Sequence, residues 1–295
     1  YGYSSFTADK RKALIDELNS GHYDVIIGVH APLAARLATI KHHLGNAKTI
    51  GWVHNSFEAL FSKQSTYIGE ELKHHYFYQF KRLDRVVVLC NFDANRYRNY
   101  DKNINPCVIY NPLTLSPGAL SKGTSKKFLA VGRFSHLHKG FDILINAFNI
   151  FAKNDKEWTL DIVGEGPEEA MFRELISKYS LENRITIHPF TSDIQSHYSE
   201  AQIYVLSSRW EGFGLVLVEA MAHGLPVVSS DLPTSHEIMG DFGMYFKNGD
   251  AEALAMKLHE ATTIDWKEKS EKAIEISRCF DVDNITAQWV SIIES

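Results

Sequence analysis

Short apolar runs alternate with longer segments of helical periodicity along most of the chain. The apolar runs are rich in β-branched and aromatic residues, which is typical of strands buried on both faces of a parallel sheet. These predicted strands are residues 24–29, 48–53, 85–89, 107–110, 128–132, 158–163, 184–188, 203–206, 227–230 and 243–246.

Segments with apolar residues at intervals of three and four predict the helices. They are residues 7–18, 32–44, 70–83, 141–153, 167–179, 192–201, 215–223 and 251–262, followed by two more helices that close the chain. Gly224, with Pro226 two residues later, is expected to end the helix at 215–223 in a left-handed conformation. The alternation of elements predicts an α/β protein with parallel sheets and helices on both faces.

The chain is long enough for two domains, because 295 residues of which 44% are hydrophobic can bury two cores. Residues 113–127 lack periodicity and contain Pro, Gly, Ser and Lys, so they are the best candidate linker. The predicted domains are residues 1–112 and 128–280. Residues 281–295 are expected to form a terminal helix that packs back on the first domain.

The net charge of −5 is unevenly distributed. Residues 1–120 carry 14 Lys and Arg against 10 Asp and Glu, a charge of +4, and the remainder carries −9. This asymmetry indicates either an acidic or membrane-bound partner or ordinary surface composition. The helix at 70–83 interleaves aromatic residues with cations, which fits a helix on anionic lipid or, more simply, a core face and a solvated face.

Cysteine content and hydropathy indicate the cellular compartment in which the protein is expected. Cys90, Cys107 and Cys279 have no metal-like spacing and are interpreted as buried thiols in a reducing compartment. No run approaches the roughly 20 apolar residues of a membrane span, and the start is not a signal peptide. We expect a cytoplasmic protein, soluble or at the inner face of the plasma membrane.

Two glutamates flank the turn between the strand at 203–206 and the helix at 215–223. Glu211 lies in the loop at the carboxyl end of the strand, where ligands of open α/β sheets bind. Glu219 lies on an otherwise apolar helix, and a charge there needs a partner. The helix start after Gly214 offers backbone N–H groups and the positive end of the helix dipole, which suits a phosphate.

The segment E-G-F-G-L-V-L-V-E-A-M-A-H-G-L-P-V-V around these glutamates resembles the glutamate-x7-glutamate signature of the retaining family 4 glycosyltransferases, which have the GT-B fold. The earlier segment V-G-R-F-S-H-L-H-K-G, which contains Arg133 and Lys139, is similar to the V-G-R-x5-K-G motif of the same family. The resemblance runs from about residue 24 to the end and is strongest over 128–246. Family members begin with a strand and a glycine-rich loop, so we expect the first domain to be incomplete.

The resemblance implies two Rossmann-like domains, the second binding a nucleotide-sugar, by family frequency a UDP-sugar, and the first a glycan or lipid-linked acceptor. Glu219 would hold the ribose hydroxyls, and Arg133 and Lys139 would neutralise the diphosphate leaving group. Glu211 would bind hydroxyls of the transferred sugar and stabilise its cationic anomeric centre. The rest of the predicted binding loop is Gly212, Phe213, Gly214 and Leu215.

His54 follows the strand at 48–53, and the family resemblance implies that it lies against the donor sugar. The alternative is a histidine whose hydrogen bonds are satisfied at a strand end. The expected reaction moves a hexose or N-acetylhexosamine in cell-surface polysaccharide or lipopolysaccharide synthesis. We expect no metal, no cofactor beyond the donor and no nucleic acid. Asp281 and Asp283 match an aspartate-x-aspartate metal motif, but their place before the last helix favours an N-cap.

Other functions are less consistent with the sequence. The segment G-E-G-P-E-E at 164–169 is close to a dinucleotide fingerprint, but Glu169 stands where the third glycine belongs, so a dehydrogenase is disfavoured. A nucleotide-sugar epimerase of the same fold is one alternative. A nucleotide-sugar-binding module that is inactive without the missing amino-terminal segment is the other.

Overall fold

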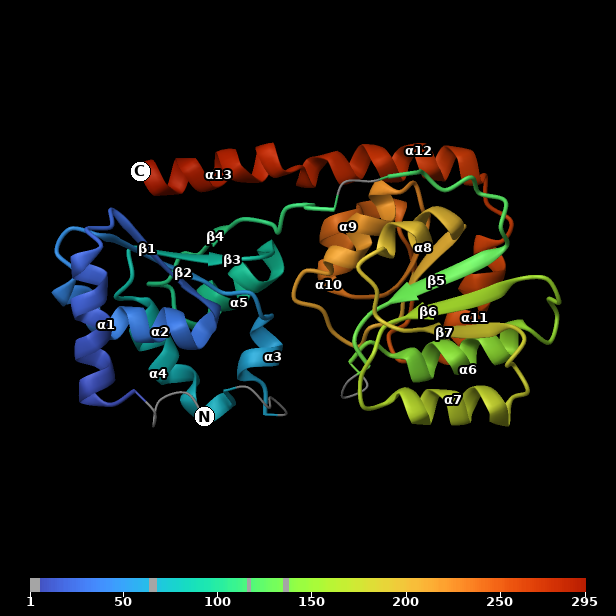
Figure 1. Ribbon diagram of the computed structural model, residues 1–295, viewed down its shortest axis with the longest axis horizontal. Coiled ribbons are helices and arrows are strands. Elements are labelled where there is room, and N and C mark those ends of the chain that lie inside the picture. Colours follow the sequence, from blue (N-terminus) through green and yellow to red (C-terminus); the bar gives the residue numbers. More distant parts are fainter. Residues whose placement is uncertain (1–5, 64–67, 116–117, 135–137) are drawn as a thin grey trace. The chain divides into compact units, whose positions relative to one another are not determined.

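The computed structural model describes residues 6–63, 68–115, 118–134 and 138–295. The chain divides into two compact units (Figure 1). Unit 1 contains residues 1–111 and 285–295, and unit 2 contains residues 112–284. Residues 113–127, the predicted linker, fall within unit 2.

Unit 1 is built on a four-stranded parallel sheet of order β1-β2-β3-β4. The strands are β1 Val25–Val29, β2 Lys48–Trp52, β3 Arg85–Val88 and β4 Cys107–Val108. Its helices are α1 Ala8–Ser20, α2 His30–Ile40, α3 Phe57–Phe61, α4 Glu70–Phe80, α5 Asn91–Tyr100 and most of α13 Val282–Glu294, with a short 3-10 helix Lys41–His43 after α2.

Both faces of this sheet are covered. On one face the alanine-rich side of α2 packs so closely that a Cβ on Gly28 would lie 2.7 Å from the Ala34 Cα. On the other face Ile285 of α13 joins a cluster with Ile50 and Val87. Small residues on α2 and glycine on β1 therefore let helix and sheet approach closely.

Unit 2 has a six-stranded parallel sheet of order β10-β9-β8-β5-β6-β7. The strands are β5 Lys127–Val131, β6 Thr159–Val163, β7 Ile185–His188, β8 Ile203–Leu206, β9 Val227–Ser230 and β10 Met244–Phe246. The helices are α6 Phe141–Phe151, α7 Glu169–Lys178, α8 Ile194–Glu200, α9 Leu215–Ala222, α10 Pro233–Met239, α11 Ala251–Ala261 and α12 Trp266–Ser277, with 3-10 helices Gly240–Phe242 and Arg278–Phe280.

Helices α6, α7 and α11 cover one face of this sheet, and α8 and α9 lie on the other, with α12 packed on α9 (Figure 1). Aromatic residues fill the first interface. Phe128 of β5 lies with its ring centroid 4.5 Å from that of Trp158 and 5.4 Å from that of Phe151. The predicted α/β class with parallel sheets and helices on both faces is confirmed.

The structure corrects several predicted elements. Helices α3 and α5 were not predicted, and the strand at 107–110 is shortened to two residues. The helix predicted at 32–44 begins at His30 and ends at Ile40, and the helix predicted at 167–179 begins only at Glu169. Cys90 is buried as expected, but Cys107 is half-buried and Cys279 is exposed. Cys279 is exposed because the short helix Arg278–Phe280 turns Phe280 inward instead.

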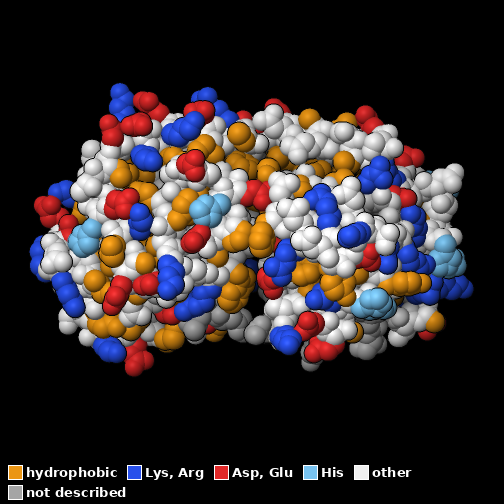
Figure 2. Space-filling model, turned by 180° about the vertical axis from the view of Figure 1, so that it is seen from behind, with side chains coloured by type: hydrophobic (Ala, Val, Ile, Leu, Met, Phe, Trp, Pro, Cys, Tyr) orange, Lys and Arg blue, Asp and Glu red, His pale blue; other side chains and the backbone are white. Residues whose placement is uncertain are grey.

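The surface of unit 1 is rich in Lys and Arg on the face shown in Figure 2, where this unit lies on the right. Most aromatic residues of α4 are core residues, because Tyr76, Phe77 and Phe80 are buried, while Tyr78 is exposed. Within the described part of the chain, no helix has the length and apolar character needed to cross a membrane.

Candidate donor-binding site

The strand order of the unit 2 sheet indicates where a ligand-binding crevice is expected. The first strand of the unit, β5, is central; β6 and β7 extend from one side of it and β8 to β10 from the other. The loops after β5 and β8 therefore leave the sheet toward opposite faces, and ligands of such sheets bind at this point. The two loops contain the residues of the predicted site, Arg133 and Lys139 after β5, and Glu211 after β8.

Hydrogen bonds to backbone carbonyls hold the two loops together. The Ser207 hydroxyl donates to the carbonyl of Lys139 at 2.8 Å, and the Arg209 N–H donates to the carbonyl of His138 at 2.8 Å. Gly140, with φ of 63°, begins α6 beside them, and a Cβ there would lie 2.0 Å from the Ser207 carbonyl oxygen. Only glycine fits this position, which explains the K-G pair of the motif.

Glu211 and Lys139 form an ion pair in the crevice. The Lys139 Nζ lies 2.7 Å from the Glu211 Oε1, and the Ser208 hydroxyl donates to the same oxygen at 2.6 Å. Both side chains are largely buried, with exposures of 17% for Lys139 and 7% for Glu211. The structure therefore brings together two predicted residues whose sequence positions are far apart.

Two further contacts fix the loop that carries Glu211. The His138 ring stacks on Trp210, with centroids 4.7 Å apart, and its Nε2 lies 2.6 Å from the Trp210 carbonyl oxygen. Because a carbonyl only accepts, this nitrogen carries the proton. Burial lowers the pKa of His138, so the neutral ring is favoured. The Arg209 guanidinium binds both carboxylate oxygens of Asp142, at 2.8 and 2.7 Å.

A cavity of about 500 Å³ opens beside these loops. Arg133 and Glu219 line it, together with Phe190 and Thr191 from the segment after β7. Arg133 is exposed and makes no hydrogen bond or ion pair with another described residue, so its guanidinium is available to a ligand. A Cβ on Gly164, which also lines the cavity, would lie 1.9 Å from the Gly132 carbonyl oxygen.

Glu219 reaches the cavity from α9 with one oxygen already held. The Tyr198 hydroxyl donates to its Oε2 at 2.8 Å. Burial raises the pKa of Glu219 above the ordinary value, and the Tyr198 hydrogen bond opposes this shift. The sequence-based expectation that this charge needs a partner is met by Tyr198, and the other oxygen can accept hydrogen bonds from a ligand.

The phosphate-binding site predicted from the sequence is the amino-terminal end of α9. Gly214 is left-handed, with φ of 87°, and among the described residues no side chain caps this helix. The helix begins at Leu215, so its first N–H groups lie just after Gly212–Gly214. The side chain of Phe213 has a structural role, since it packs on Phe280 with ring centroids 5.7 Å apart. Residues 135–137 of the V-G-R motif lie outside the described residues.

His54 belongs to unit 1 and lies just after β2. Its ring centroid is 4.1 Å from that of Trp52 and 5.1 Å from that of His30. Burial, and secondarily His30, lower its pKa, so the neutral ring is favoured. Its Nε2 is buried without a hydrogen-bond partner among the described residues. The alternative of a histidine fully satisfied at a strand end is therefore not what the structure shows.

Several residues of the site escaped the sequence analysis. Ser208 contacts Glu211, Tyr198 contacts Glu219, and Phe190 and Thr191 line the cavity. Phe190 and Thr191 follow the strand predicted at 184–188, so the strand-end rule that selected His54 also applies to them. No sequence signal distinguished Tyr198 from a core tyrosine.

Residues 115–279 match the family model described as "Glycosyl transferases group 1". An uncharacterized glycosyltransferase of Haemophilus influenzae is 34% identical over 229 residues, which are 77% of this chain and 61% of that protein. The amylovoran biosynthesis glycosyltransferase AmsD of Erwinia amylovora is 28% identical over 221 residues, covering 71% of this chain and 62% of AmsD. The chain thus spans about three fifths of the length of these two relatives.

Among solved structures, the Anabaena protein Alr3699/HepE in complex with UDP matches 97% of this chain and 82% of its own length. The TM-score is 0.85 and the sequence identity 19%. This likeness shows the fold. The chain therefore has the GT-B fold and belongs to the group 1 glycosyltransferase family, which confirms the resemblance found in the two motifs.

Proposed function

We propose that the protein transfers a hexose or N-acetylhexosamine from a UDP-sugar to a glycan or lipid-linked acceptor, in polysaccharide or lipopolysaccharide synthesis. The observations that carry the proposal are the Lys139–Glu211 ion pair and the cavity lined by Arg133 and Glu219, both at the switch point of the unit 2 sheet. The role of the Erwinia relative in amylovoran biosynthesis and the UDP bound to the Anabaena protein support the donor and pathway class.

The diphosphate of the donor would lie between Arg133, Lys139 and the start of α9. Departure of the nucleotide leaves negative charge on the diphosphate, and fixed cations and N–H groups at that place stabilise the transition state. Protein groups alone supply this stabilisation, so the proposed reaction needs no metal.

Glu219 would accept hydrogen bonds from the ribose hydroxyls, with Tyr198 holding its other oxygen in place. Glu211, held by Lys139 and Ser208, would bind hydroxyls of the transferred sugar and stabilise its positive anomeric carbon. We propose retention of the anomeric configuration, with the departing phosphate taking the acceptor's proton on the same face of the sugar. The role of His54 beside the sugar stays a prediction.

Incubation with UDP-sugars and a glycan acceptor tests the proposal. Radiolabel in the acceptor together with free UDP supports transfer. Free UDP or an altered sugar without labelled acceptor indicates the epimerase, and donor binding without any release of UDP indicates a binding module. The excess of Lys and Arg in residues 1–120 supports a secondary proposal: the protein contacts an anionic membrane surface on its cytoplasmic side, and this membrane presents the acceptor.

A further inference from the structure

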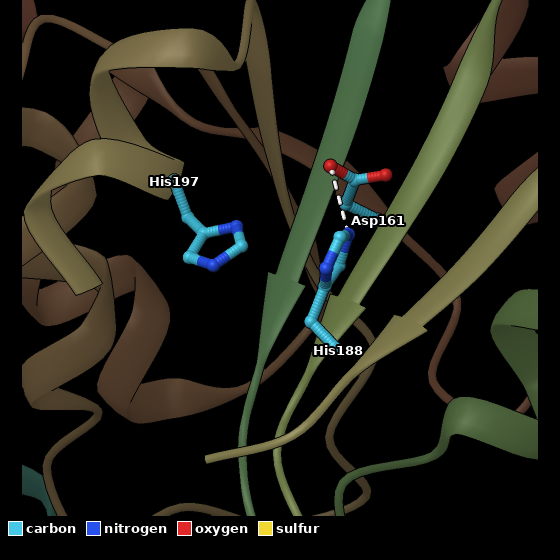
Figure 3. Close-up of side chains that lie close together, drawn as sticks. All are labelled: Asp161, His188 and His197. Atoms are coloured by element: carbon cyan, nitrogen blue, oxygen red, sulfur yellow. Dashed lines mark ion pairs between the residues drawn. The ribbon is translucent and has the colours of Figure 1, made fainter. Parts of the chain in front are cut away.

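Three metal-ligand side chains meet in unit 2 outside the proposed catalytic loops. Asp161 of β6, His188 at the end of β7 and His197 of α8 extend toward one another (Figure 3). Their ligand atoms all lie within 4.8 Å of one another. Asp161 is buried and the two histidines are half-buried, so the cluster is partly open to solvent on the α8 side of the sheet.

We propose that Asp161, His188 and His197 bind one divalent transition-metal ion of the zinc type. Two imidazoles and one carboxylate, with water in the fourth position, are a common ligand set for Zn²⁺. Bonds of about 2.0–2.1 Å in a tetrahedron place neighbouring ligand atoms about 3.4 Å apart. The Asp161 Oδ2 and the His188 Nε2 are already 3.3 Å apart, so only His197 must approach.

The His188 Nε2 provides an independent reason to expect a ligand. This nitrogen is buried and has no hydrogen-bond partner among the described residues, although it lies in ion-pairing range of Asp161 (Figure 3). Buried polar atoms are nearly always satisfied, and an orphan calls for an explanation. A metal bound to this nitrogen would satisfy it.

Lys127 is the competitor for the site, because its Nζ lies 2.9 Å from the Asp161 Oδ2. The same Nζ lies 3.7 Å from a carboxylate oxygen of Glu200, whose side chain is 67% exposed and free to turn. When the metal takes Asp161, Lys127 therefore has a second acidic partner within reach. The exchange leaves no buried charge unpaired.

Binding should depend on pH. The charged or titratable groups facing the site are Lys127, Asp161, His188, His197 and Glu200, from β5, β6, β7 and α8. Metal ions and protons compete for imidazole nitrogens, so affinity falls as the pH falls.

The metal would also stiffen one wall of the donor cavity. Residues 189–193 join His188 to α8, and Phe190 and Thr191 in this segment line the cavity together with Ile194 of α8. An ion held by His188 and His197 clamps both ends of the segment. This consequence rests on the proposed function, whereas the metal site does not.

The test is a calorimetric titration of the tag-free full chain with Zn²⁺ at pH 7.5, with the visible spectrum of bound Co²⁺ as a second measurement. We expect one ion per chain. His188→Ala and His197→Ala should each weaken binding by at least about 10-fold. His197→Cys should retain it, because a thiolate is also a zinc ligand. The matched control is His236→Ala, since His236 pairs with Asp231 at 2.6 Å on the surface of the same unit.

A wild-type chain that takes up no stoichiometric zinc overturns the proposal. An equal loss of zinc affinity in His236→Ala and His197→Ala also overturns it. The same holds if His197→Cys loses as much zinc affinity as His197→Ala. If His188→Ala proves unfolded by circular dichroism, the comparison of the Ala and Cys variants of His197 decides.

The effect on the donor cavity is measured by titrating UMP with and without Zn²⁺. UMP affinity should rise with zinc in the wild type and stay constant in His197→Ala, which also controls for zinc bound by UMP itself. Zinc uptake without a change in UMP affinity overturns the coupling alone. Absence of UMP binding under every condition counts against the proposed function and leaves the zinc titration unaffected.

Discussion

The Nζ of Lys139 lies 2.7 Å from the Oε1 of Glu211, so the lysine expected to meet the donor phosphates already neutralises the carboxylate expected to meet the sugar. Both groups are largely buried, and neither charge can be removed without changing the other. The roles of the two residues in leaving-group and sugar stabilisation are therefore coupled.

Glu211→Gln is expected to lower kcat by about 100-fold, because it removes the negative charge that is proposed to stabilise the anomeric centre. The amide keeps the shape and still accepts from Ser208. Lys139 loses its counter-charge, so UDP should bind as tightly as before or more tightly. Glu157→Gln, at an exposed carboxylate paired with Lys126, is the matched control. Loss of UDP binding with unchanged kcat would reverse the assigned roles.

Arg133→Ala and Lys139→Ala should each lower transfer by about 100-fold or more, because each removes a cation from the departing diphosphate. Their effects on stability should differ. Arg133 is exposed, so its loss should leave the unfolding free energy unchanged, whereas loss of Lys139 leaves Glu211 buried without its cation and should cost about 1–3 kcal/mol. Urea unfolding and UDP-release assays measure both quantities, with Arg173→Ala on α7 as control. Wild-type turnover in either variant at saturating donor would show that the phosphates are misplaced.

The affinity for UDP should depend on the ionisation of Glu219. Its pKa is raised by burial, so it becomes protonated at a higher pH than an exposed glutamate and then loses an acceptor for the ribose. As the pH falls toward 5, UDP affinity should fall more steeply in the wild type than in Glu219→Gln. Parallel pH profiles for the two proteins would contradict this role.

The raised pKa of Glu219 also determines how the stability of the fold changes with pH. A carboxyl whose folded pKa is raised contributes most stability below its ordinary pKa and loses that contribution as the pH rises through the raised value. Glu219→Gln should therefore raise the melting temperature at pH 7 while weakening UDP binding. A lower melting temperature at pH 7 would show that the ionised carboxylate stabilises the fold.

Chelation by EDTA should leave kcat at saturating donor unchanged, because Arg133, Lys139 and the α9 N–H groups are the groups proposed to stabilise the leaving diphosphate. The proposed zinc site would alter donor affinity only. Loss of kcat on chelation, restored by manganese, would instead assign Asp281 and Asp283 to a catalytic metal. Donor concentration must be varied in the same assay to separate the two effects.

The sequence predicted the sheets well where local pattern determines structure. The apolar runs of unit 2 became strands, and Gly224 ends α9 with φ of 78°, as expected from the glycine and Pro226. The Rossmann-type strand order brings the loops after β5 and β8 together. For this reason two motifs far apart in sequence could be assigned to one site.

What escaped prediction depends on packing in three dimensions. Helix α5 carries few apolar residues, and its fit depends on the buried Ala94 and Tyr97, which no periodicity reveals. Tyr198 looks like a core residue until its hydroxyl is seen 2.8 Å from Glu219. Asp161 and His188 lie on adjacent strands, and only strand pairing brings them to 3.3 Å.

A calorimetric titration with UDP tests the central claim, that the crevice of unit 2 holds the nucleotide of the donor. The wild-type chain should bind one UDP, Arg133→Ala and Glu219→Ala should each weaken binding by about 10-fold or more, and Glu211→Gln should retain it. ADP and GDP in parallel titrations test the base. A wild-type chain that binds no UDP, or equal UDP affinity in the wild type, Arg133→Ala and Glu219→Ala, would contradict the account.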